Sequence, residues 1–185
     1  MSTTAGDGHA RPPRCVVRTM RWTDLDEVAA MERLVHPDSA WSVAVWWAEL
    51  AQRPARHYIV LEIVVESGGD AGSGHVAGYA GLTVSGRSAD IMTIAVGPSF
   101  RGQGWGSVLL AALHDAATRA GVDEVMLEVR ADNPGALALY AAHGYSTVSV
   151  RRGYYQPGAV DAIVQRHELP GGDGPSDDRR DSKGG

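Results

Sequence analysis

Apolar and polar residues follow two different periods along the chain, and each change of period marks the boundary of an expected element. Runs rich in β-branched residues favour strands, whereas apolar residues three and four positions apart favour helices. Strands are expected at 15–21, 58–66, 75–84, 89–96, 123–129, 145–151 and 160–167. Helices are expected at 24–35, 42–51, 104–120 and 134–143. This interleaved order predicts one mixed α/β domain.

Residues that favour helix ends support these boundaries. Thr23 or Asp24 is suited to cap the first helix and Ser42 the second, because a short polar side chain accepts a hydrogen bond from a free N–H of the first turn. Asn133, which precedes a proline, predicts the start of the last helix, and Gly144 predicts its end.

Three segments contain too few apolar residues to join a core. Residues 1–13 and 170–185 consist mainly of Gly, Pro, Ala, Thr, Ser and charged residues, so both ends are expected to be disordered. The folded domain is therefore expected to span 14–169. A third segment, 67–74 (SGGDAGSG), predicts a soft loop that joins two strands into a hairpin.

Composition narrows the class of protein. A chain of 185 residues, 44% hydrophobic and 21% charged, fits one soluble domain, and no apolar run approaches the roughly 20 residues that span a bilayer. The net charge of −5 argues against general nucleic-acid binding, and the seven histidines show no metal-ligand spacing. A lone Cys15 forms no intramolecular disulfide, and residues 1–14 lack the apolar core of a secretory signal. We expect a cytoplasmic protein without a metal site.

The strongest motif is the glycine-rich sequence RGQGWG at 101–106, between an expected strand and a long helix. Glycines let the backbone approach a bulky anion, and the helix N-terminus adds a positive dipole end, so the motif predicts a pyrophosphate site. A Rossmann dinucleotide loop is a weaker alternative, because residues 97–101 separate the motif from its strand and Ser107 stands at the third glycine position. A glycine-rich turn without a ligand is the other alternative.

A second stretch, 127–145, contains groups suited to acyl transfer to an amine. That reaction removes a proton from the amine and gives one to the departing thiolate. Glu128, near the end of an expected strand, is a candidate base, and Tyr140, on the following helix, is a candidate acid. A solvated surface carboxylate and a packed core tyrosine are the structural alternatives. Neither motif contains a cysteine, which favours direct transfer over an acyl-enzyme.

The glycine motif resembles the R/Q-x-x-G-x-G/A motif of the GNAT superfamily of acetyltransferases. The resemblance implies a mixed, mostly antiparallel sheet flanked by helices, with acetyl-CoA as co-substrate. It also implies that the strand before the motif pairs with the pantetheine arm and that the motif holds the phosphates. Trp105 departs from the family, which usually has an aliphatic residue there. The implied cofactor-binding residues are Ile94, Ala95, Val96, Arg101, Gly102, Gln103, Gly104, Trp105, Gly106 and Ser107.

The sequence LEVRADNPGALALY at 127–140 resembles, more narrowly, the RimI-like branch of that superfamily, which acetylates the N-terminal alanine of ribosomal small-subunit protein eighteen. In that branch the Glu is the general base, through water, and the Tyr is the general acid. The resemblance carries these roles to Glu128 and Tyr140, and a CoA contact to Asn133. It implies an N-terminal peptide of a ribosomal protein as the acceptor.

Two further segments resemble the same branch: RRGYY at 151–155 and HPDSAWS at 36–42, which borders the acceptor site there. Trp41, Tyr154 and Tyr155 are therefore expected to bind the acceptor, although the two tyrosines are also suited to pack on a sheet edge. Two other functions stay open. One is a relaxed N-terminal or lysine acetyltransferase, and the other is an acyl-CoA-binding module that has lost catalysis.

Overall fold

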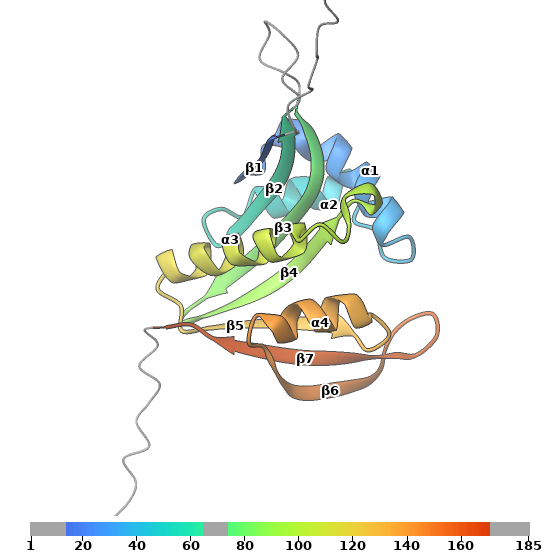
Figure 1. Ribbon diagram of the computed structural model, residues 1–185, viewed down its shortest axis with the longest axis vertical. Coiled ribbons are helices and arrows are strands. Elements are labelled where there is room, and N and C mark those ends of the chain that lie inside the picture. Colours follow the sequence, from blue (N-terminus) through green and yellow to red (C-terminus); the bar gives the residue numbers. More distant parts are fainter. Residues whose placement is uncertain (1–13, 65–73, 171–185) are drawn as a thin grey trace, which may run out of the picture.

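The computed structural model describes residues 14–64 and 74–170, which form a seven-stranded sheet with helices on both faces (Figure 1). The two expected tails, apart from 170, and the loop at 67–73 lie outside the described residues. No helix of the described part is long and apolar enough to cross a membrane. The elements are β1 (Arg14–Thr19), η1 (Trp22–Asp24), α1 (Leu25–Val35), α2 (Val43–Leu50), β2 (Arg56–Val64), β3 (His75–Ser85), β4 (Ser88–Val96), η2 (Pro98–Phe100), α3 (Trp105–Arg119), β5 (Glu124–Arg130), α4 (Pro134–Ala142), β6 (Ser146–Tyr155) and β7 (Val160–Glu168).

The sheet order is β1-β2-β3-β4-β5-β7-β6, and only the β4–β5 pair is parallel. The predicted hairpin is confirmed, since β2 and β3 pair in antiparallel fashion. The mixed and mostly antiparallel sheet is confirmed as well. β6 runs to Tyr155 instead of ending at Arg151, because its last residues bulge through Gly153 (φ +61°) and pair again at Tyr155 with Val160. The RRGYY motif therefore belongs to a strand at the edge of the sheet.

The sheet opens between its two parallel strands. β4 and β5 pair only from Ser88 opposite Glu124 to Ile91 opposite Leu127. Beyond that point β4 stays paired with β3 and β5 stays paired with β7, so the two halves diverge, as Figure 1 shows. The β5-facing edge of β4 after Ile91 therefore has no neighbouring strand.

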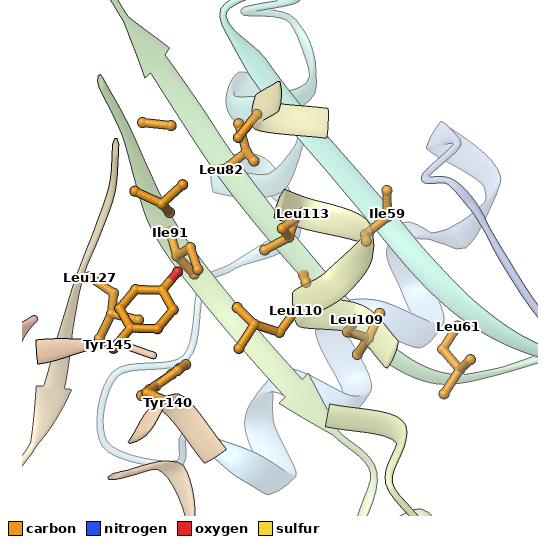
Figure 2. Close-up of a cluster of buried hydrophobic side chains, with 14 of the residues drawn as sticks. Ile59, Leu61, Leu82, Ile91, Leu109, Leu110, Leu113, Leu127, Tyr140 and Tyr145 are labelled. Carbon is orange, nitrogen blue, oxygen red and sulfur yellow. The ribbon is translucent and has the colours of Figure 1, made fainter. Parts of the chain in front are cut away.

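Each face of the sheet has its own core. On one face, leucines of α3 pack against strand residues, with Tyr140 of α4 and Tyr145 beside them (Figure 2). On the other face, α1 and α2 cover the first strands around Trp46, which contacts the rings of Tyr58 and Tyr79 edge-on at 5.4 Å each. Burial of these large apolar side chains stabilises both layers and fixes where the loops between them lie.

Two of the expected helix caps are confirmed and one is wrong. The Ser42 side chain accepts a hydrogen bond from Val45 N–H, and Asn133 accepts one from Ala136 N–H. The buried Asp24 carboxylate does not cap α1; it accepts two hydrogen bonds from the Arg18 guanidinium, at 2.7 and 2.9 Å, and one from Arg21 N–H at the start of η1, at 2.7 Å. A buried carboxylate needs a cation to offset its lost hydration, and that requirement outweighs capping here.

Candidate active site

A cleft of about 1680 Å³ lies where β4 and β5 separate. Its walls come from the free edge of β4, the glycine-rich loop, the end of β5, α4, the segment between α1 and α2, and the end of β6. Fifteen of the sixteen residues predicted for the site from sequence line it. Gln103 does not, because its amide turns back to donate to Ser99 C=O. Within the described residues, no group of three or more His, Cys, Asp or Glu side chains is placed to hold a metal ion.

The glycine-rich loop needs glycine at two positions. Gly102 and Gly104 have φ of +74° and +83°, in the left-handed region that other residues adopt only at a cost. A Cβ built on either would meet nothing within 4 Å, so the space above the loop is open to a ligand. Gly106 serves packing instead, because its Cβ would lie 3.2 Å from Leu139 of α4. Two glycines of the motif therefore shape an open backbone surface, and the third lets two helices approach.

The backbone of this loop has free donors. Arg101 N–H donates to Pro98, and Ser107 and Val108 donate to Gly104 C=O. The N–H groups of 102–106 have no acceptor among the described residues. They lie at the N-terminus of α3, a helix of 15 residues, where unpaired N–H groups and the helix dipole favour an anion. A pyrophosphate group fits this donor set.

Trp105, the departure from the family pattern, lies between the loop and the core. Its ring is partly buried against the α3–α4 side of the sheet and lines the cleft. Its Nε1–H lies 3.4 Å from Oε1 of Gln103. The indole therefore packs against the core and also lines the cleft.

The free edge of β4 carries the three residues predicted to pair with the pantetheine arm. Ile94, Ala95 and Val96 are paired with β3 on one side and line the cleft on the other. The carbonyl of Val96 accepts a hydrogen bond from Arg101 Nε at 3.1 Å, which ties the loop to the strand. Backbone groups on an unpaired strand edge are free to bind an extended ligand.

The two candidate catalytic side chains come from the opposite wall. Glu128, on β5, is partly exposed, and its Oε1 lies 2.6 Å from Nη1 of Arg151 on β6. Tyr140, on α4, is 4% exposed, packs its ring against Tyr145 at 5.5 Å and still lines the cleft. Burial, with a smaller effect of Tyr155, raises the pKa of Tyr140 above its ordinary value, so its hydroxyl stays protonated and able to donate. Tyr140 is thus both a core residue and a group of the cleft.

The remaining predicted residues, Trp41, Tyr154 and Tyr155, line the same cleft from the α1–α2 segment and from β6. The two tyrosine rings meet edge-on at 5.2 Å, and the guanidinium of Arg130 lies 5.2 Å from the centre of the Tyr155 ring. Burial, then the charge of Glu128, raises the pKa of Tyr155. Asn133, the cap of α4, lies on the α4 wall. Both tyrosines therefore lie in the cleft, at the end of the edge strand β6.

The cleft also contains a buried carboxylate that was not predicted from the sequence. Glu32 is 3% exposed and accepts hydrogen bonds from the Tyr79 hydroxyl and, at 3.4 Å, from Trp41 N–H. It therefore fixes the segment that carries Trp41. A signal was available: Glu32 follows Val28 by four residues, so it lies on the buried face of α1, where an unexplained acid is rare.

Comparisons with known proteins agree with this geometry. The model of the acetyltransferase (GNAT) family matches residues 20–145. The N-alpha-acetyltransferase RimI of Mycobacterium tuberculosis is 38% identical over 150 residues, covering 78% of this chain and 87% of that protein. The putative [ribosomal protein bS18]-alanine N-acetyltransferase of Bacillus subtilis is 31% identical over 151 residues, covering 82% and 93%.

A solved structure shows the same fold. The ribosomal-protein-S18-alanine N-acetyltransferase from Escherichia coli superposes with a TM-score of 0.71 at 28% identity, covering 84% of this chain and 94% of that one. The family model and the relatives span the glycine loop, the free edge of β4 and most of the opposite wall of the cleft. The resemblance found in the motifs is thereby confirmed: the chain belongs to the GNAT family and is an acetyl-CoA-dependent N-acetyltransferase.

Proposed function

We propose that this enzyme acetylates the α-amine of the N-terminal alanine of ribosomal small-subunit protein eighteen, by direct transfer from acetyl-CoA. One observation carries the proposal. Relatives named for alanine N-acetylation of that protein align with this chain over about nine-tenths of their length, and the segments that resemble them meet in one cleft. We also infer that residues 14–169 form the catalytic domain. A ribosomal acceptor would place the enzyme in the cytoplasm.

In this mechanism each wall of the cleft has one task. The N–H groups of 102–106 and the free edge of β4 hold acetyl-CoA, which supplies the thioester to be cleaved. Glu128 accepts the proton of the acceptor amine through a water molecule. The neutral amine nitrogen then bonds to the carbonyl carbon and releases its remaining extra proton to water, while the carbon–sulfur bond breaks. The protonated hydroxyl of Tyr140 gives its proton to the departing sulfur.

The chemistry of the base favours an α-amine over a lysine. An α-amine has a pKa near 8 and a lysine amine near 10.4, so at pH 7 about a tenth of α-amines are neutral, against fewer than about one lysine in a thousand. In this mechanism Glu128 acts through water and its carboxylate is already paired with Arg151, so an amine that is partly neutral at pH 7 suits the site best. An extended peptide N-terminus also suits the cleft between Trp41 and Tyr154–Tyr155.

An acetylation assay with mass-spectrometric localisation tests the proposal. A peptide that begins Ala-Arg and contains an internal lysine should be labelled on its α-amine, and N-formylation should abolish turnover. Glu128→Gln should slow that reaction at neutral pH by about 100-fold, the usual contribution of an acid–base group. Label mainly on lysine would point to a lysine acetyltransferase. Acetyl-CoA binding without thiol release from any peptide would point to a non-catalytic module.

A further inference from the structure

The ion pair between Glu128 and Arg151 spans a strand. One row of residues across the sheet contains Arg130 of β5, Ala162 of β7 and Arg151 of β6. Glu128 lies on β5 in the next row, opposite Val164 of β7. Arg151 therefore reaches diagonally across β7 to place its Nη1 2.6 Å from the Glu128 carboxylate.

Other groups around this pair do not compete for Glu128. Arg130, its neighbour on β5, is held by Asp132 through two hydrogen bonds at 2.9 and 2.8 Å. Tyr155 also faces Glu128, but as a neutral phenol, since burial and the charge of Glu128 raise its pKa. The guanidinium of Arg151 itself lies 5.5 Å from the centre of the Tyr154 ring, in the acceptor half of the cleft. Arg151 is thus the cation that contacts the proposed base within the described residues.

We propose that Arg151 determines which amines this enzyme acetylates, by neutralising Glu128 and so restricting transfer to amines that lose their proton near neutral pH. The inference rests on the proposed role of Glu128 as the base. Arg151 acts through Glu128, so it is a specificity-determining residue and takes no proton itself.

The charges of this pair favour one kind of amine over the other. The guanidinium of Arg151, in contact with the Glu128 carboxylate, cancels much of the attraction that a bare carboxylate would exert on an incoming ammonium group. This disfavours a lysine, which is almost entirely an ammonium at pH 7, more than an α-amine. Without Arg151, Glu128 would present a free negative charge to the cleft.

Arg151→Gln tests the inference, with Arg151→Lys as the charge-conserving variant. The control is Arg152→Gln: Arg152 is the next residue of β6, is also exposed, and makes no ion pair with another described residue. Two peptides compete in one assay at pH 7, one with a free N-terminal alanine and one with a blocked N-terminus and a single lysine. The ratio of lysine to α-amine acetylation is measured by mass spectrometry. Melting temperature and acetyl-CoA binding establish that each variant is folded.

Arg151→Gln should raise that ratio about three- to fivefold over wild type, the scale of a solvent-accessible ion pair. Arg151→Lys should restore most of the wild-type ratio, and Arg152→Gln should not change it. An unchanged ratio in Arg151→Gln, or an equal change in Arg152→Gln, overturns the inference. The proposed function is tested separately by the wild-type preference, because the inference concerns only the change from wild type to variant.

Discussion

Acidification should destabilise this enzyme through one histidine cluster. His114 of α3 lies stacked on His167 of β7, with ring centroids 4.7 Å apart, and edge-on to His143 at 6.2 Å. Its Nε2 is 2.8 Å from the Tyr145 hydroxyl. Burial, then the charges of His167 and His143, lowers the pKa of His114 from 6.5 to about 4, against a small opposing effect of Asp115. The folded protein therefore resists protonation of His114.

The sign and size of the effect follow from this shift. Below pH 6.5 the unfolded chain takes up a proton at His114 that the folded protein does not bind, so stability is fully present above pH 6.5 and falls toward pH 4. For a fully enclosed group, the loss between pH 7.5 and 5 would be about 2 kcal/mol. His114 is only partly buried, so solvent screening reduces this to about 1 kcal/mol, or roughly 2–4 °C in melting temperature.

Thermal melts of wild type and His114→Gln at pH 7.5 and pH 5, at equal ionic strength, measure this contribution. Other titratable groups contribute equally to the loss of stability between pH 7.5 and pH 5 in both proteins. The difference between the losses of wild type and His114→Gln therefore gives the contribution of His114. His114→Gln should lose about 1 kcal/mol less than wild type on acidification. If His114→Gln loses as much stability as wild type, the cluster does not resist protonation and the reasoning fails.

Two further predictions concern the cleft. Gly104→Ala and the control Gly86→Ala should each lower the free energy of unfolding by about 1–2 kcal/mol, because both glycines have positive φ and open space around them. Only Gly104→Ala should abolish the rise in melting temperature on adding acetyl-CoA. An intact rise in that variant would place the phosphates elsewhere. Tyr140→Phe should lower kcat about 100-fold while the Kd for acetyl-CoA stays near that of wild type, as measured by calorimetry; a near-wild-type kcat would leave Tyr140 a packing residue only.

Features set by neighbouring residues were predictable from the sequence. Ser42 and Asn133 cap their helices as expected, because a cap needs only a short polar side chain and the N–H groups that follow it. The open loop at Gly102 and Gly104 was predictable for a similar reason, since glycine adopts positive φ without the steric cost that other residues have. Most predicted strand and helix boundaries agree with the observed ones within one or two residues, because the spacing of apolar residues follows from the local geometry of a helix or a strand.

The tertiary structure alone decided how distant segments meet. Asp24 was expected as a cap, but Arg18 and the core enclose it, and the cost of burying a charge exceeds the gain from a cap. Glu128 was predictable as a candidate base, whereas its partner Arg151 depends on β7 lying between β5 and β6. The cleft depends on where β4 and β5 stop pairing, which follows from their other neighbours. Such contacts reflect strand order and packing across the whole domain, and residue periods along the chain do not encode them.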